Sequence, residues 1–153
     1  MFGNGAASKV FYFIKNTNRL APETLKLLWK TAVDNPLSGH IAGLLGGFNL
    51  NLIQLSDIEV YLRGTASLDL TCYIKLFEDM INYDATPVLK TIKCPALIIS
   101  GTKDAITPPE YQKKMHKKIK HSQLVDFPYG SHATQMDMPN LVNISIEKFL
   151  NKL

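Results

Sequence analysis

Two polar residues, an aspartate and a histidine, each follow an apolar segment that ends in a turn. Asp104 lies in "SGTKDAITPPE", after the apolar run "CPALIIS", and His132 lies in "PYGSHATQ", after "QLVDF". A carboxylate that accepts a hydrogen bond from one imidazole nitrogen fixes the tautomer of the ring and leaves the other nitrogen free to act as a base. Taken singly, each residue is more often an ordinary loop residue, because such residues are common in turns. Taken together, they predict an acid–base pair.

The elements that must position this pair belong to a predicted α/β region. Residues 94–100 and 123–127 are short apolar runs bounded by proline and glycine, which favours strands of a parallel sheet. Thr107-Pro-Pro-Glu110 has the pattern of a capping box, so a helix is expected after it, and another helix is expected after Pro139. Loops that leave the carboxyl ends of parallel strands lie at one edge of the sheet. We therefore expect Asp104 and His132 to converge.

The first part of the chain has a different pattern. Residues 1–19 are expected to be irregular, and residues from about 20 to 90 are expected to be helical. One helix should begin at Pro22 and stop at Asn35-Pro36, and others should begin at the capping box Ser56-Asp-Ile-Glu59 and near Asp69. The sequence thus predicts an irregular segment and a helical region over residues 1–90, followed by an α/β portion over residues 91–153.

Composition and charge narrow the functional classes. The 153 residues are 46% apolar and 20% charged, as in soluble globular domains, and no apolar run approaches the ~20 residues of a membrane span. Much of the net charge of +4 falls in residues 111–121, where a solvated helix face is favoured over a nucleic-acid or membrane patch. Cys72 and Cys94 have neither metal-site nor disulfide-framework spacing. We expect a cytoplasmic protein without metal, cofactor or nucleic acid.

Residues 87–153 resemble the C-terminal third of an α/β-hydrolase. The resemblance rests on the "GTKD" turn after one strand, the "GSH" turn after the next, and a final helix that starts at a proline and ends in "EKFL". It implies that Asp104 is the acid and His132 the base of a catalytic triad. The preceding helical region resembles the lid of that family. The implied fold is a partial α/β-hydrolase fold, a helical lid followed by a strand–helix–strand–helix unit of a parallel sheet.

The sequence also departs from that family. The nucleophile of these enzymes lies in a G-x-S-x-G turn between a strand and a helix, and this sequence contains none. Ser8, Ser38 and Ser131 each lack the flanking pattern that the turn requires. The resemblance implies a hydrolase of ester-like acyl substrates in which His132 serves a nucleophile outside these residues. An apolar run over residues 44–55 favours a small lipophilic ester, although packing within the fold is the more ordinary interpretation of such a run.

A non-catalytic alternative stays open. The chain could be an inactive, truncated hydrolase that serves as a binding or dimerising module. Two parallel strands do not form a stable sheet alone, and unpaired strand edges favour association. The expected macromolecular partner is therefore the missing N-terminal half of the fold or a second copy of the chain.

Overall fold

The computed structural model describes residues 6–35, 37–44 and 47–153, which form two compact units. One unit comprises Met1–Ser38 and Glu59–Asp84, and the other comprises Gly39–Ile58 and Ala85–Leu153. We refer to them as unit 1 and unit 2. Residues 39–58 thus belong to the same unit as the C-terminal region that carries Asp104 and His132.

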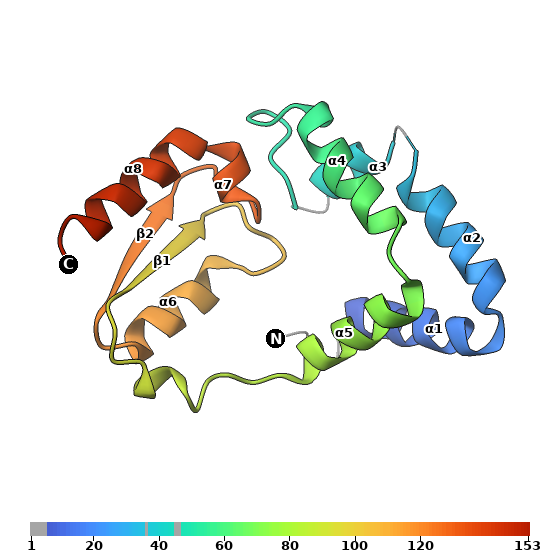
Figure 1. Ribbon diagram of the computed structural model, residues 1–153, viewed down its shortest axis with the longest axis horizontal. Coiled ribbons are helices and arrows are strands. Elements are labelled where there is room, and N and C mark those ends of the chain that lie inside the picture. Colours follow the sequence, from blue (N-terminus) through green and yellow to red (C-terminus); the bar gives the residue numbers. More distant parts are fainter. Residues whose placement is uncertain (1–5, 36, 45–46) are drawn as a thin grey trace. The chain divides into compact units, whose positions relative to one another are not determined.

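Unit 2 contains a two-stranded parallel sheet. Strand β1 (Ala96–Gly101) pairs with β2 (Ser122–Phe127) in a register that places Ala96 opposite Ser122 and Gly101 opposite Phe127. Helix α6 (Pro109–Lys118) forms the crossover, and α7 (Thr134–Asp137) and α8 (Pro139–Leu150) follow β2 (Figure 1). The predicted order of strand, helix, strand and helix is confirmed, with the short α7 added.

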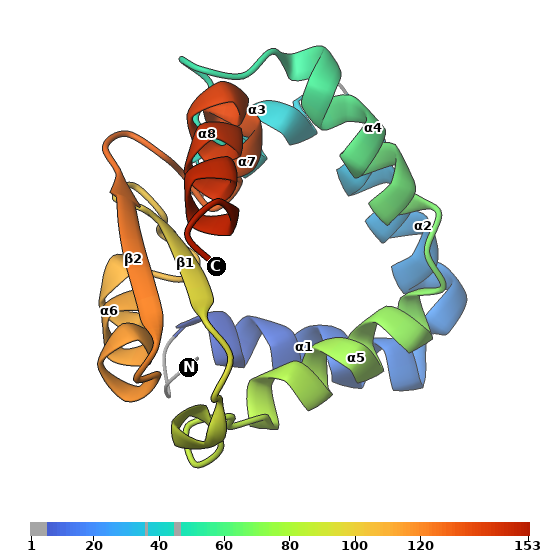
Figure 2. The same ribbon diagram turned by 60° about the vertical axis from the view of Figure 1, so that its left-hand side comes forward.

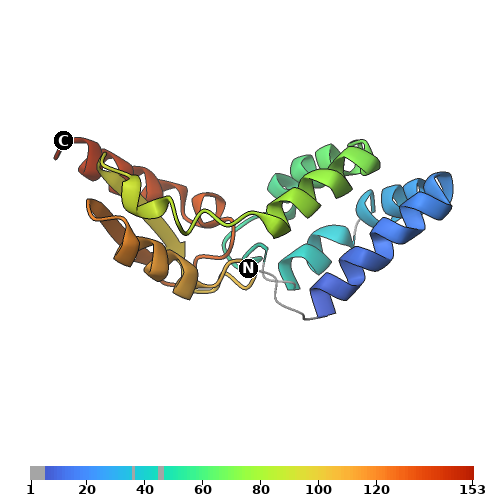
Figure 3. The same cartoon turned by 90° about the horizontal axis from the view of Figure 1, so that it is seen from below.

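Helices cover both faces of this sheet. Helix α6 lies on one face, whereas α7 and α8 lie on the other (Figures 2 and 3). Buried apolar side chains in the strands, in α8 and at the ends of α6 and α7 are Ile98, Ile119, Phe127, Ala133 and Val142. The 3-10 helix η1 (Leu89–Thr91) precedes β1. Because Gly101 and Phe127 are paired, the two strands end side by side and release their loops at the same edge.

Unit 1 is helical. It contains α1 (Ala6–Leu20), α2 (Pro22–Val33), α5 (Leu70–Asn82) and the C-terminal part of α4 (Leu55–Ala66), while α3 (Ser38–Leu44) begins at its boundary. Phe11 of α1 packs with Leu70 and Ile74 of α5 in a buried cluster. The partly buried side chains around this cluster are Ile14, Leu25, Trp29, Tyr73, Phe77 and Ile81. None of the helices in the described ranges is both long and apolar enough to cross a membrane.

Helix α1 corrects the sequence-based expectation that residues 1–19 are irregular. Residues 6–20 are helical, and residues 1–5 lie outside the described ranges. Phe11 and Ile14 are three positions apart, so a helix places both on one face, where they pack against α5. The aromatic "VFYFI" hides this pattern, because Tyr12 and Phe13 are exposed. Packing against a segment about 60 residues away, which local sequence does not reveal, selects the helix.

Two of the predicted helix starts are confirmed. Asp69 caps α5, its Oδ1 accepting from Cys72 N at 2.7 Å, and Pro22 is the first residue of α2, as expected. Helix α2 ends at Val33, and the proposed stop at Pro36 lies outside the described residues.

Both predicted capping boxes are wrong. Helix α4 starts at Leu55, so Ser56 lies inside its first turn, and Glu59 pairs with Arg63 on the exposed face. Helix α6 starts at Pro109, with Pro108 as its N-cap, so Thr107 lies one residue too early to cap it. The hydroxyl of Thr107 instead bonds to Asp104.

Candidate active site

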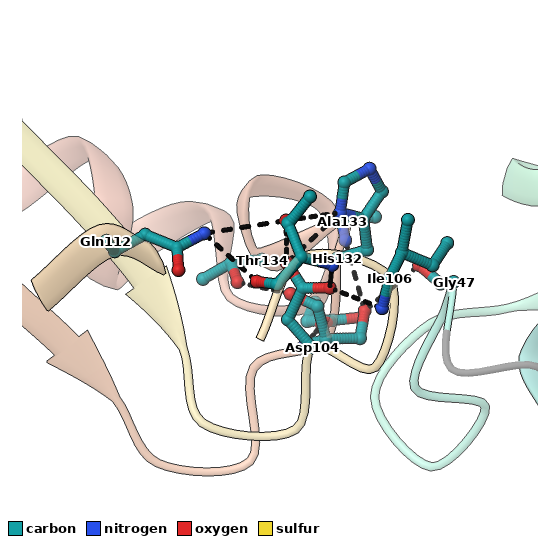
Figure 4. Close-up of polar contacts among 10 residues, drawn as sticks. Gly47, Asp104, Ile106, Gln112, His132, Ala133 and Thr134 are labelled. Carbon is teal, nitrogen blue, oxygen red and sulfur yellow. Dashed lines mark hydrogen bonds and ion pairs between the residues drawn. The ribbon is translucent and has the colours of Figure 1, made fainter. Parts of the chain in front are cut away.

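The structure brings Asp104 and His132 into contact. Asp104 lies three residues beyond the end of β1, and His132 lies five residues beyond the end of β2. His132 Nδ1 is 3.0 Å from Asp104 Oδ2, within hydrogen-bonding distance (Figure 4). Asp104 is only 7% exposed, whereas the side chain of His132 is 44% exposed. The pair therefore consists of a buried carboxylate and an imidazole that reaches the surface.

The second nitrogen of His132 lies on the far side of the ring from Asp104 (Figure 4). A neutral imidazole that donates its Nδ1–H to a carboxylate carries a lone pair on Nε2. Within the described ranges, no residue hydrogen-bonds to Nε2. This arrangement leaves Nε2 available to accept a proton from a group outside the loop.

Asp104 is held by its own turn. Its Oδ1 accepts from the backbone N–H groups of Ile106 at 2.9 Å and Thr107 at 2.7 Å, and its Oδ2 accepts from Thr107 Oγ1 at 2.7 Å. Burial raises the pKa of Asp104, but the hydrogen bonds from Thr107 and then His132 outweigh burial and bring the pKa below its ordinary value of 3.8. Asp104 is therefore an anion at neutral pH, which suits a partner for an imidazolium.

Thr107 and Gln112 form a second layer behind the carboxylate. Thr107 Oγ1 lies 3.2 Å from His132 Nδ1, so the ring N–H faces both the carboxylate and the hydroxyl. Gln112 Nε2 donates to Thr107 O at 3.1 Å and lies 3.4 Å from Thr107 Oγ1. Sequence reasoning assigned Thr107 to a helix cap and overlooked Gln112. The Asp-x-x-Thr spacing, which suits an aspartate-centred turn, was the available signal.

Close packing joins the two loops. A Cβ on Gly101 would lie 2.4 Å from the carbonyl oxygens of Gly130 and Ser131, and a Cβ on Gly130 would lie 3.1 Å from Gly101 Cα. Lys103 N donates to Gly130 O at 2.8 Å across the same junction. The positive φ of the turn occurs at Tyr129 (70°), and Gly130 allows the close approach of the two loops.

A second buried carboxylate, Asp137, supports the loop of His132. Its Oδ2 accepts from Ser131 N at 2.5 Å, and its Oδ1 accepts from Asn49 N at 3.2 Å. Neither Asp137 nor Asn49 was singled out from the sequence. Asn49 lies 88 positions before Asp137, and no local pattern links them.

The serines considered as nucleophiles have other contacts. Ser131 is 2% exposed, and its Oγ donates to Gly47 O at 3.3 Å and accepts from Ala133 N at 3.2 Å. Ser38 Oγ donates to Asn35 O at 2.7 Å, and the side chain of Ser8 lies outside the described residues. No group of three or more metal-ligating side chains was found in the part of the chain that the structure describes.

Comparison with known proteins shows the family of this chain. The α/β-hydrolase family model described as TAP-like protein matches residues 64–153, more than half of the chain. Similar curated proteins include the AB hydrolase superfamily protein YisY of Bacillus subtilis, 35% identical over 68 residues, which are 44% of this chain and 25% of that protein. A pimeloyl-[acyl-carrier protein] methyl ester esterase of Neisseria meningitidis is 42% identical over 50 residues, 33% of this chain and 19% of that protein.

A human relative, serine hydrolase BPHL, is 35% identical over 63 residues, which are 41% of this chain and 22% of that protein. The matched part of the chain thus spans a quarter or less of the length of each of these relatives. No solved structure gives a match.

Proposed function

We propose a hydrolytic function for this chain, which belongs to the TAP-like family of the α/β-hydrolase superfamily. The proposed reaction is acyl transfer from an ester-like substrate to water, with Asp104 and His132 as two members of a catalytic triad. The observation that carries the proposal is the 3.0 Å contact between His132 Nδ1 and Asp104 Oδ2, with Nε2 on the open side of the ring.

In this mechanism, His132 Nε2 removes the proton of a serine hydroxyl as its oxygen attacks the ester carbonyl. The imidazolium then gives that proton to the leaving alcohol, and an acyl-enzyme remains. Water then attacks the acyl-enzyme with Nε2 again as the base, the imidazolium returns the proton to the serine oxygen, and the carboxylic acid leaves. Asp104 holds the ring in the Nδ1–H tautomer and stabilises the imidazolium, which its ionised state favours.

The nucleophile in this proposal lies outside the 153 residues, which contain no G-x-S-x-G sequence. The occupied hydroxyls of Ser131 and Ser38 support this assignment. The serine would be supplied by another segment of a longer chain or by a partner chain. An esterase among the relatives favours an ester substrate. The apolar residues Phe48, Leu50, Leu52 and Ile53 favour a lipophilic acyl group, in keeping with a lid role for the N-terminal helical region.

A chimaera tests the proposed roles. Residues 87–153 would replace the corresponding C-terminal segment of the Neisseria esterase, and hydrolysis of p-nitrophenyl esters would be measured. We expect His132→Gln to lower kcat by about 10⁴–10⁶-fold and Asp104→Asn by about 10⁴-fold. His121→Gln, which alters an exposed histidine in a different loop, is the matched control. A folded His132→Gln chimaera with unchanged kcat would refute the role of His132.

The second candidate function is that of an inactive binding or dimerising module, which the missing nucleophile turn favours. A fluorophosphonate probe on the unmodified chain tests whether any of its own serines is a reactive nucleophile. Labelling of Ser8, Ser38 or Ser131 that His132→Gln abolishes would place the nucleophile inside the chain. Absence of labelling here, together with an active chimaera, is the result that we expect.

A further inference from the structure

We propose that Asp137 is a positioning residue that joins the loop of His132 to residues 47–49 and thereby holds His132 Nδ1 on Asp104. The catalytic consequence rests on the function proposed above, whereas the positioning itself concerns this chain alone. All of the residues involved belong to unit 2.

The first support is that Asp137 is a buried carboxylate that accepts hydrogen bonds from two segments of the chain. Asp137 is 6% exposed and lies at the end of α7. Its two oxygens face two different segments, with Ser131 N on Oδ2 and Asn49 N on Oδ1. A buried carboxylate needs such donors, because an unpaired charge in the interior is costly. The side chain thus links two backbone segments that are far apart in the sequence.

The second support is that the same two segments meet at two further points. Asn49 Nδ2 donates to Tyr129 O at 2.7 Å, and Ser131 Oγ donates to Gly47 O at 3.3 Å. Residues 47–49 are therefore linked to residues 129–131 by two direct hydrogen bonds and by the bridging carboxylate of Asp137. The segment forms a support against which the histidine loop rests.

The third support is the position of Ser131 next to His132. Asp104 is fixed within its own turn by Ile106 and Thr107, so the Asp104–His132 distance depends on where the histidine loop lies. Lys103 N holds that loop at Gly130 O, and Asp137 holds it at Ser131 N. A displacement of about half an ångström or of 10–20° is enough to spoil a catalytic geometry. Asp137 thus acts on the pair without touching either reacting group.

The test uses nuclear magnetic resonance of the ¹⁵N-labelled 153-residue chain and its Asp137→Asn variant. The amide keeps the shape of the side chain but replaces one acceptor oxygen by an NH₂ donor. We expect loss of the Nδ1–H signal of neutral His132 and exchange of the Ser131 amide at least about tenfold faster, because a hydrogen bond to a charged acceptor is removed. Asp126→Asn removes the same charge at an exposed position of β2 and should change neither signal.

Several outcomes decide the proposal. Faster Ser131 exchange with an unchanged His132 signal would reduce Asp137 to a purely structural residue and overturn the proposal. If Asp137→Asn does not fold, Asp137→Ser keeps a small polar side chain that is too short to hold both Ser131 N and Asn49 N, and the same two signals should change in the same direction. A folded Asp137→Ser chain with both signals unchanged would equally overturn it. These measurements require no nucleophile, so an inactive chimaera and a failed positioning role are distinguishable.

Discussion

Thr107 Oγ1 lies 2.7 Å from Oδ2 of Asp104, the same oxygen that faces the ring of His132. The hydroxyl proton points to the carboxylate, so a lone pair of Oγ1 remains for the imidazole N–H at 3.2 Å and for the amide of Gln112. Thr107 Oγ1 thus donates to Asp104 and can accept from His132 and Gln112. The charge of Asp104 is thus stabilised from its own turn as well as by the histidine.

The first prediction is that Thr107→Val raises the pKa of Asp104. The valine keeps the shape and the backbone N–H but removes the hydroxyl bond to the ionised carboxylate, which favours the neutral form. The ¹³C signal of the Asp104 carboxyl group, followed as the pH is lowered, measures the change. Thr91→Val is the control, because the Thr91 hydroxyl donates to the nearby Val88 O. An Asp104 titration identical in the two variants would contradict the prediction.

A second prediction concerns stability at acidic pH. The pKa of Asp104 is lower in the native state than its ordinary value of 3.8, so the unfolded state binds more protons around that pH. The contribution of Asp104 is complete above about pH 5 and is lost as the pH falls through 3.8 toward the lower native value. Asp104→Asn should therefore show a weaker decline of the unfolding free energy over this interval. Urea unfolding at a series of pH values, followed by amide signals of β1 and β2, gives the unfolding free energy of both chains against pH. Parallel curves for the unchanged chain and Asp104→Asn would contradict the prediction.

The third prediction isolates the junction of the two loops. Gly101→Ala should destabilise unit 2 by about 2–3 kcal/mol, because the added methyl would meet two backbone carbonyl oxygens that cannot move away freely. Gly64→Ala is the matched control, since no other part of the described chain lies within 4 Å of its Cβ position in α4. Alanine there should stabilise the helix by about 1 kcal/mol. Chemical denaturation of both variants gives the comparison. Equal effects would show that the close approach of Gly101 and Gly130 has little weight.

The sequence was sufficient for the contact between Asp104 and His132 because it follows from topology. Two apolar runs separated by one helix predict parallel strands, and parallel strands bring their carboxyl-end loops to one edge. The pairing of Gly101 with Phe127 places the ends of β1 and β2 side by side, as expected. The order of the elements alone therefore brings the two residues together.

The residues that support Asp104 and His132 could not be predicted from the order of the elements. Thr107 matches two local patterns, a helix cap and a partner of Asp104, and only the position of Pro108 at the N-cap decides between them. Asp137 and Asn49 depend on a contact between segments 88 positions apart. Helix α1 depends in the same way on packing of Phe11 against α5. Long-range contacts of this kind leave no local trace in a single sequence.

The last prediction tests that packing in unit 1. Phe11 is 6% exposed, and its ring lies 5.3 Å from that of Phe77, whereas Phe13 on the same helix is 70% exposed. Phe11→Ala should lower the unfolding free energy of unit 1 by about 3 kcal/mol, through lost burial and the cavity left behind. Phe13→Ala removes the same group at the surface and should change it by no more than about 0.5 kcal/mol. Fluorescence of Trp29, which lies in the same cluster, follows the unfolding of this unit. Similar effects of the two substitutions would mean that packing of Phe11 against α5 does not stabilise α1.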